Sequence, residues 1–333
     1  MKVYTNDDVP TDSLEGGRIA ILGSGSQGRA HAQNLRDSGY DVVAGVRKGG
    51  RGWTNARADK IQTAEPADAV KDADLIAVLT PDMAQEAVWK EVIAPNAKKG
   101  AALLFAHGFS IHYGRVQARA DMDVVLVAPK GPGDLVRREF IRGRGVPALF
   151  AVHQDATETA RARAMAYAKG IGGASGGLIE TTFAEETETD LFGEQAVLCG
   201  GAKELVMAGY QTLVDAGYQP EVAYFECMQE LKLIVDLFYE GGVSKMHDFI
   251  SETAKYGAVV SGPRIITEET RQRMREVLKD IQAGNFARDW ILENQAGKPR
   301  YTALLNADRQ HPIEKTGAAL RERMSWLKSP TNA

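Results

Sequence analysis

Residues 18–35, RIAILGSGSQGRAHAQNL, join an apolar run, a glycine-rich turn and a stretch with helical spacing. The turn places Gly23, Gly25 and Gly28 in the spacing GxGxxG directly after the apolar run. Glycine permits a tight turn and lets a pyrophosphate lie close to the backbone, at the N-terminus of the following helix. The stretch therefore predicts a strand, a phosphate-binding turn and a helix, which together are typical of a dinucleotide-binding fold.

Apolar runs of the same kind alternate with helical stretches as far as about Phe183. They are RIAILGSG (18–25), DVVAGVR (41–47), LIAVLT (75–80), ALLFAHG (102–108), DVVLVAPK (123–130), PALFAVHQ (147–154) and GLIETTF (177–183). Such strands indicate a doubly wound, parallel, Rossmann-type sheet covered on both faces. Helical patterns dominate the rest of the chain. We therefore expect an α/β dinucleotide-binding domain over 1–182, an all-α domain over 183–328 and a disordered tail over 329–333.

Composition narrows the class of protein. The chain has 333 residues, of which 44% are hydrophobic and 25% charged, as in soluble globular proteins. No apolar run reaches the roughly 18 residues of a spanning helix, and the N-terminus lacks the pattern of a signal peptide. A net charge of −4 gives no reason to expect nucleic acid. We expect a cytoplasmic protein without membrane or nucleic-acid partners, in which Cys199 and Cys227 are reduced core thiols, a disulfide being the alternative.

The loop after the second predicted strand bears on the choice of cofactor. In this fold an acid at that point holds the ribose 2′-hydroxyl of NAD, whereas Arg accommodates the 2′-phosphate of NADP. Residues 46–51, VRKGGR, contain Arg47, Lys48 and Arg51 and no acid. These cations favour NADP, yet no hydroxyl side chain stands among them before Thr54. An exposed basic loop without a ligand would fit the same residues.

Two pairs of carboxylates have helical spacing. Asp190 and Glu194 lie four residues apart in TETDLFGEQA (187–196), as do Glu226 and Glu230 in a stretch that is apolar nearly all round. Residues four apart share one face of a helix, and an apolar helix is expected to be buried. Carboxylates are the ligands that Mg²⁺ and Mn²⁺ prefer, and two such ions could polarise a carbonyl and stabilise an alkoxide. The alternative for each pair is a solvated helix face.

Further motifs extend over the whole chain. They are GSQG (25–28), AHGF (106–109), APKGPG (128–133), ETETDLFGEQ (186–195), ECMQELKLIVDL (226–237) and SETAKYG (251–257). With them the chain resembles, from about Lys2 to Lys328, a ketol-acid reductoisomerase (acetohydroxyacid isomeroreductase) of the short type, whose all-α domain is knotted. The resemblance implies Mg²⁺-dependent conversion of 2-acetolactate or 2-aceto-2-hydroxybutyrate, which are small 2-hydroxy-3-keto acids, into 2,3-dihydroxy acids. It also implies reduction by NAD(P)H and a place in valine, leucine and isoleucine biosynthesis.

The resemblance also assigns the predicted metal ligands. Asp190 would bridge two Mg²⁺ ions, Glu194 would complete the first site, and Glu226 with Glu230 would bind the second from the partner chain. Glu230 would also handle a proton. The active sites would then be shared within a homo-oligomer, with dimer against dodecamer left open.

Other site residues follow from the resemblance too. Ser251 of the partner would bind the substrate carboxylate, and His107 and Lys130, at strand ends, would hydrogen-bond metal-bound water. The alternatives are a helix N-cap for Ser251, a strand cap for His107 and a solvated cation for Lys130. The implied cofactor-binding residues are Gly23, Gly25, Ser26, Gln27, Gly28, Arg47, Lys48, Arg51 and Gly133.

The chain departs from the family pattern at Gly50 and Gly52, where relatives more often carry serines that bind the 2′-phosphate. NADPH is therefore the expected cofactor by family default, with NADH or dual use as the alternative. Two other functions fit the sequence: a metal-free hydroxyacid dehydrogenase of the sugar-acid type, and a non-catalytic NAD(P)-binding redox sensor. EDTA sensitivity would separate the first of these from the favoured reading, and acetolactate-dependent oxidation the second.

Overall fold

A computed structural model of the chain describes residues 2–10 and 13–324. It forms two compact units, Met1–Thr189 and Asp190–Ala333, which are called the N-terminal and C-terminal units below. Helix α10 (Phe183–Phe192) runs across the boundary between them. None of the helices in the described ranges has both the length and the hydropathy that a membrane crossing requires. The tail predicted at 329–333 lies outside the described residues.

The N-terminal unit is built on a nine-stranded sheet of order β1-β9-β8-β7-β6-β5-β2-β3-β4. The strands are β1 (Val3–Tyr4), β2 (Arg18–Leu22), β3 (Asp41–Gly45), β4 (Gln62–Ala64), β5 (Leu75–Val78), β6 (Ala102–Phe105), β7 (Asp123–Pro129), β8 (Ala148–Gln154) and β9 (Leu178–Glu180). Each of the seven predicted runs contains a strand. The two that were not predicted, β1 and β4, are short and lie at the sheet edges, where little apolar surface is needed.

The sheet is mostly parallel, but β8 runs antiparallel to β7, and β1 antiparallel to β9. The predicted parallel sheet is confirmed for β2 to β7, whereas β8 and β9 run in the opposite direction. Lys130, directly after β7, donates its backbone N–H to the carbonyl of Pro147, directly before β8, at 2.8 Å. The chain thus returns to the same end of the sheet that it left, so β8 must run in the opposite direction.

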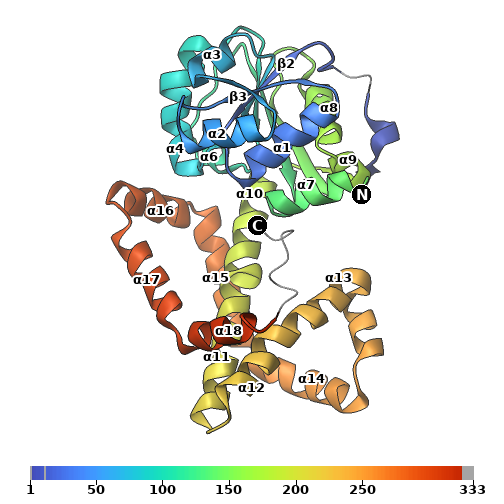
Figure 1. Ribbon diagram of the computed structural model, residues 1–333, viewed down its shortest axis with the longest axis vertical. Helices are drawn as coiled ribbons and strands as arrows, with labels where there is room; N and C mark the ends of the chain where they lie inside the picture. Colours follow the sequence, from blue (N-terminus) through green and yellow to red (C-terminus); the bar gives the residue numbers. More distant parts are fainter. Residues whose placement is uncertain (1, 11–12, 325–333) are drawn as a thin grey trace. The chain divides into compact units, whose positions relative to one another are not determined.

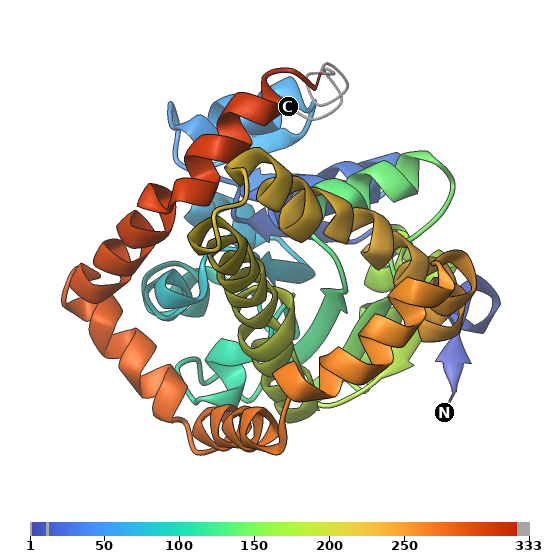
Figure 2. The same cartoon turned by 90° about the horizontal axis from the view of Figure 1, so that it is seen from below.

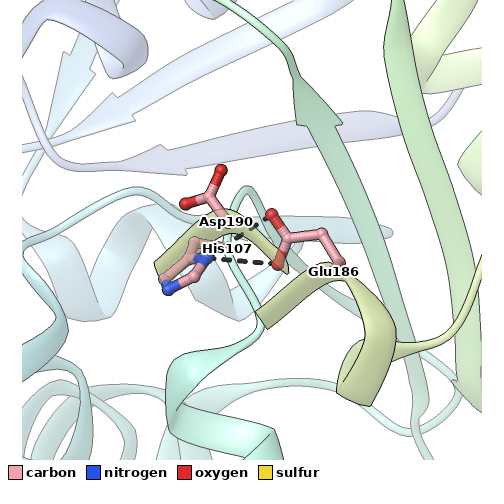
Figure 3. A group of neighbouring side chains, drawn as sticks. All are labelled: His107, Glu186 and Asp190. Carbon is pink, nitrogen blue, oxygen red and sulfur yellow. Dashed lines mark hydrogen bonds and ion pairs between the residues drawn. The ribbon is translucent and has the colours of Figure 1, made fainter. Parts of the chain in front are cut away.

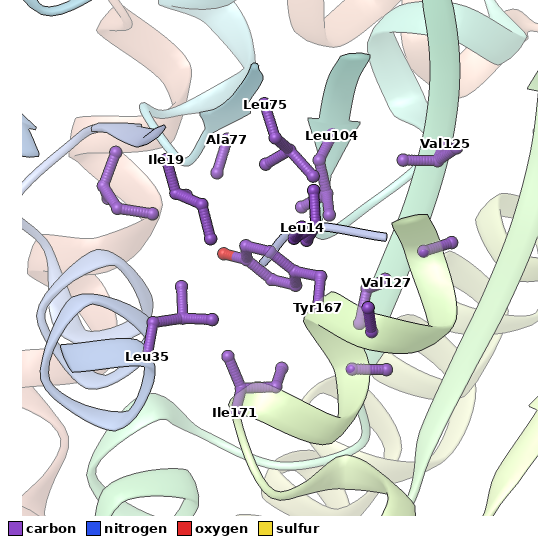
Figure 4. Packing of buried hydrophobic residues seen from close by; sticks show 14 of the residues in the cluster. Leu14, Ile19, Leu35, Leu75, Ala77, Leu104, Val125, Val127, Tyr167 and Ile171 are labelled. Carbon is purple, nitrogen blue, oxygen red and sulfur yellow. The ribbon is translucent and has the colours of Figure 1, made fainter. Parts of the chain in front are cut away.

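Apolar clusters cover both faces of the sheet, as predicted. Ile19 and Ile21 of β2 point into one cluster with α1 (Ser26–Asp37) and α8 (Ala160–Gly170), while Ala20 and Leu22 point into the other. Tyr167 of α8 fills the centre of the first cluster (Figure 4). This alternation is what a strand buried on both faces requires.

The remaining helical segments of the N-terminal unit connect the strands. They are η1 (Asn6–Asp8), α2 (Arg51–Ala58), α3 (Pro66–Lys71), α4 (Asp82–Val88), η2 (Trp89–Ile93), α5 (Ala94–Asn96), α6 (Phe109–His112), α7 (Gly133–Ile141) and α9 (Gly173–Gly176).

The C-terminal unit is all-helical over its described residues, as predicted. Its segments are η3 (Gly193–Leu198), α11 (Gly200–Asp215), α12 (Pro220–Tyr224), η4 (Phe225–Gln229), α13 (Glu230–Phe249), α14 (Glu252–Ile265), α15 (Glu268–Gln282), α16 (Asn285–Gln295), α17 (Pro299–Gln310) and α18 (Pro312–Arg321). Helices α15 to α18 follow one another around an open curve (Figures 1 and 2). A small core joins α11, α12 and α18 through Val206, Tyr210, Tyr224 and Ile313.

Two burial predictions were wrong in this unit. The apolar stretch that contains Glu226 and Glu230 is not buried within one chain, since Leu233 is 57% exposed and Tyr239 92%. The cysteines are free, as predicted, but Cys199 is exposed, and Cys227 is only half-buried at the margin of the small core. In both cases the helices of a single chain leave open the apolar faces that the sequence pattern suggested were covered.

His31 of α1 makes the stability of the fold depend on pH. Its side chain is fully buried, with Nδ1 2.9 Å from the hydroxyl of Tyr167 and with no partner for Nε2 among the described residues. Burial lowers the pKa of His31 from 6.5 to about 3. In the unfolded chain His31 therefore binds a proton near pH 6.5, whereas in the folded chain it binds one only at much lower pH. Stability is unaffected above that pH and is lost as the pH falls toward the folded value, by about 1.4 kcal/mol per pH unit.

We predict that replacing this ring removes that dependence. Between pH 6.5 and 5, the unfolding free energy of the wild type should fall by about 2 kcal/mol more than that of His31→Gln. Urea titrations at several pH values measure the difference. Equal pH dependence in the two proteins would contradict the assignment.

Candidate functional site

The site is assembled at the carboxyl ends of two neighbouring parallel strands. His107 lies two residues after β6, and Lys130 directly follows β7. Because Phe105 of β6 is in register with Leu126 of β7, His107 and Lys130 both lie at the carboxyl end of the sheet. Open α/β sheets bind their ligands at this end. Helix α10 carries Glu186 to His107, and Asp190 follows one turn later (Figure 3).

Glu186 connects these elements. Its carboxylate is 1% exposed, accepts hydrogen bonds from the backbone N–H of Gly108 at 2.9 Å and from Lys130 Nζ at 3.0 Å, and lies 3.1 Å from His107 Nδ1. Burial alone would raise the pKa of Glu186, but the hydrogen bond to His107 and the charges of His107 and Lys130 outweigh it and lower the pKa below its usual value. The buried group is therefore an ionised carboxylate that fixes two potential proton donors.

Sequence reasoning did not assign a role to Glu186, although the residue stands in the motif ETETDLFGEQ. A usable signal was present: Glu186, Asp190 and Glu194 continue one series at intervals of four residues. The prediction paired only Asp190 with Glu194 and therefore left Glu186 out of the series. Glu188, on the same helix, lies with Oε1 3.6 Å from His112 Nε2.

One group of metal-ligating side chains forms in the described residues: His107, Glu186 and Asp190, whose ligand atoms all lie within 4.8 Å of one another. Two carboxylates suit an oxygen-preferring ion such as Mg²⁺, which rarely takes a His ligand. Glu186 already accepts from Gly108 and Lys130, so the donor set fits a metal held chiefly by Asp190. The protein thus presents the carboxylate of Asp190 and two cationic or proton-donating groups, His107 and Lys130, at one point.

The predicted carboxylate pairs lie only in part on regular α-helices, since Asp190 belongs to α10. Glu194 belongs to the π-helical segment η3, Glu226 belongs to the π-helical segment η4, and Glu230 is the first residue of α13. A π turn is wider than an α turn and is frequent at functional sites. All three side chains are exposed, and within the described part of the chain none joins the group around Asp190.

Ser251 is the N-cap of α14. Its Oγ accepts a hydrogen bond from the backbone N–H of Ala254 at 3.1 Å, which is the structural alternative considered for it. A capping hydroxyl uses its oxygen as the acceptor and keeps its own proton for another partner. The capping role therefore leaves Ser251 able to donate to a carboxylate.

The glycine-rich turn lies between β2 and β5, at the point where the strand order reverses. Gly23 has φ of +119°, and a Cβ there would lie 2.3 Å from the carbonyl oxygen of Leu79. A Cβ at Gly28 would lie 2.2 Å from the carbonyl oxygen of Gly23, whereas nothing lies within 4 Å of one at Gly25. The chain itself requires glycine at 23 and 28. At Gly25, which begins α1 without a side-chain cap, the open space fits a pyrophosphate.

The start of α7 supports this turn. A Cβ at Gly133 would lie 2.3 Å from the carbonyl oxygen of Ser26, and Gln27 Nε2 donates to the carbonyl of Gly131 at 2.9 Å. These contacts hold the first turn of α1 in place. Ser26, Gln27 and Gly133 therefore position the backbone that a dinucleotide would approach.

The basic loop lies after β3. Arg47, Lys48 and Arg51 are exposed, and no ion pair involves them in the described ranges. Gly50 begins α2 without a side-chain cap, and a Cβ at Gly52 would lie 2.5 Å from Ser24 Oγ. A serine at position 52 would therefore require Ser24 to move.

Comparisons with known proteins agree over nearly the whole chain. Family models for "Acetohydroxy acid isomeroreductase, NADPH-binding domain" and "Ketol-acid reductoisomerase, C-terminal domain" match residues 13–177 and 183–326. A ketol-acid reductoisomerase (NADP(+)) from Xanthomonas campestris pv. campestris is 59% identical over 329 residues, 99% of this chain and 97% of that protein. One from Xylella fastidiosa is 61% identical over 312 residues, 94% and 89% of the two chains. The structure of an NADH-preferring ketol-acid reductoisomerase from an uncultured archaeon has a TM-score of 0.93 at 41% identity, covering 97% of this chain and 99% of that one.

We predict opposite consequences for two glycines of the turn. Gly28→Ala should lower the unfolding free energy by about 1–3 kcal/mol, because the new methyl group meets the backbone of Gly23. Gly25→Ala should leave stability unchanged and weaken dinucleotide binding by about ten-fold or more, because its methyl group occupies the space of the ligand. Thermal unfolding and fluorescence titration with NADPH and NADH measure the two effects. Equal affinity in Gly25→Ala and wild type would show that no phosphate approaches this turn.

Proposed function

The chain belongs to the ketol-acid reductoisomerase family, and from that premise we propose how its residues divide the work of rearranging and reducing a 2-hydroxy-3-keto acid. The family's reaction moves a methyl or ethyl group to the neighbouring carbonyl carbon and then reduces the new ketone with a nicotinamide cofactor. The observation that carries the assignment is the group of Asp190, Glu186 and His107 at the carboxyl edge of the sheet, with Lys130 bound to Glu186.

We assign the metal ligands in this chain to four carboxylates. Asp190 would bridge two Mg²⁺ ions, Glu194 would complete one site, and Glu226 with Glu230 would hold the other. Ions held by these carboxylates would supply the charge that polarises a carbonyl and stabilises a developing alkoxide. The series of acids on α10 and the π turns at Glu194 and Glu226 support this arrangement.

His107 and Lys130 act as the proton-holding groups of the N-terminal unit. Glu186 orients both through its contacts with them, and its lowered pKa keeps it ionised at neutral pH. The substrate, which carries a carboxylate, would bind beside these groups at the carboxyl end of the sheet. Ser251 would donate its hydroxyl proton to that carboxylate, and Glu230 would move a proton at the reacting oxygens.

We propose that the working form is a homo-oligomer in which Glu226, Glu230 and Ser251 reach the site of a partner chain. These residues lie on helices with large exposed apolar side chains, among them Leu233, Tyr239, Phe249 and Tyr256. Apolar surface of this extent marks an interaction site. The absence of Glu226 and Glu230 from the described group around Asp190 supports a site that one chain does not complete.

The cofactor that we propose is NADPH, with NADH as a second hydride donor. Support for NADPH comes from the matching NADPH-binding family model, from the relatives named for NADP(+), and from three exposed cations after β3. Support for NADH comes from the missing loop hydroxyls and from the similar structure, which is that of an NADH-preferring enzyme. Within this chain the glycine turn binds the pyrophosphate, and the loop after β3 meets the ribose.

The assignment is tested by neutralising one carboxylate. Asp190→Asn should reduce acetolactate-dependent NADPH oxidation by at least about a thousand-fold, because it removes the proposed bridging ligand, while leaving NADPH binding within about two-fold. Glu185→Gln, which changes an exposed acid on the same helix, is the matched control and should retain wild-type turnover. Wild-type activity should vanish with EDTA and return with Mg²⁺. Turnover in Asp190→Asn, or activity in EDTA, would overturn the assignment.

The sharing of sites between chains is tested by mixing two inactive variants. If Asp190 and Glu226 of different chains form one site, a dimer of Asp190→Asn with Glu226→Gln contains one intact and one doubly altered site. Co-expression should then restore about a quarter of wild-type activity, because half of the dimers are mixed and each has one working site. Sites formed within one chain would show no recovery.

A further inference from the structure

The acid that is missing after β3 is supplied by the neighbouring strand. Glu65 directly follows β4, whose last residue, Ala64, is in register with Gly45, the last residue of β3. The Oε1 atom of Glu65 accepts a hydrogen bond from the backbone N–H of Lys48 at 2.8 Å. The sequence of the loop alone shows only cations, but in the folded chain this loop also holds a carboxylate.

The hydrogen bonds in this loop leave few groups to recognise a 2′-phosphate by geometry. The backbone N–H of Gly50 donates to the carbonyl of Arg47, and Glu65 occupies the N–H of Lys48. The hydroxyl of Thr54 donates to the carbonyl of Gly50 at 3.4 Å. A hydroxyl at position 52 would meet Ser24. Recognition of a phosphate therefore depends on the charges of Arg47, Lys48 and Arg51 and on the uncapped N-terminus of α2, both of which act electrostatically.

Because recognition of the phosphate is electrostatic, one carboxylate beside the loop would change the relative affinity for phosphorylated and unphosphorylated ribose. Glu65 is exposed and forms no ion pair with the three cations in the described structure, so its negative charge would lie beside a ribose bound at this loop. A carboxylate accepts a hydrogen bond from a ribose hydroxyl but repels a phosphate dianion. The same group thus fixes the backbone of Lys48 and disfavours the phosphorylated ribose.

We propose that Glu65 is a specificity-determining residue, which positions the loop after β3 and shifts its preference from the 2′-phosphorylated dinucleotide toward the unphosphorylated one. The inference rests on the proposed use of a nicotinamide dinucleotide. It deepens that proposal, because it names the group that allows NADH to compete in a loop with three cations.

The test compares ligands that differ only at the ribose 2′ position. Dissociation constants for 2′,5′-ADP and 5′-AMP, and for NADPH and NADH, are measured by calorimetry on the full-length protein. Glu65→Gln keeps an oxygen acceptor for Lys48 and removes the charge. It should shift the affinity ratio toward the 2′-phosphorylated ligand by about five-fold at low salt and by less at 0.5 M salt. Glu65→Ala should shift the ratio similarly and also weaken both ligands, because Lys48 loses its acceptor.

Asp68→Asn is the matched control. Asp68 is an exposed acid in the first turn of α3, the helix of which Glu65 is the N-cap, and no hydrogen bond or ion pair joins it to the loop after β3 in the described residues. The control should change the ratio by less than about two-fold, because solvent screens its charge. An unchanged ratio in Glu65→Gln, or an equal change in Asp68→Asn, overturns the inference. If the wild type binds neither dinucleotide, it is the proposed function that fails.

Discussion

The buried carboxylate of Glu186 is the interaction on which the candidate site depends. An ionised group this deeply enclosed is tolerated only with partners, and breaking such a pair costs about 3–5 kcal/mol. Three groups are the partners here: the backbone N–H of Gly108 and the side chain of His107, which follow β6, and the side chain of Lys130, which follows β7. Helix α10 and strands β6 and β7 must therefore keep their relative placement for the charge to remain compensated. That constraint also fixes where Asp190, one turn later on α10, presents its carboxylate.

A second constraint, made of backbone contacts, governs the dinucleotide end. Gly23, Gly28 and Gly133 each lie where a methyl group would come within 2.3 Å of a backbone atom of another segment. Close backbone approach joins β2, the start of α1 and the start of α7 into one support. Gly25 differs, since nothing of the protein fills the space beside it. The GxGxxG spacing thus combines two glycines required by the fold and one available to a ligand.

The sequence predicted the features that repeat along the chain. Continuous apolar residues predict strands such as β2 and β5. The loss of such runs after about Phe183 predicts the all-α part. Features set by the return path of the chain were not predictable: the antiparallel β8 follows from the contact between Lys130 and Pro147. Glu186 and Glu65 were missed for a related reason, because the partners of each lie on other elements, between 17 and 79 residues away. The spacing of residues within one segment of sequence does not predict such contacts.

The apolar helices of the C-terminal unit show a different limit. An apolar pattern indicates that a face is covered, but it does not say by which chain. Leu233 and Tyr239 are exposed although their stretch has the composition of a buried helix. A carboxylate such as Glu230 on this stretch would be desolvated once a partner covered the surrounding side chains, and desolvation strengthens its attraction to a divalent cation. In the proposed homo-oligomer, covering the apolar face and completing the metal site would then be one event.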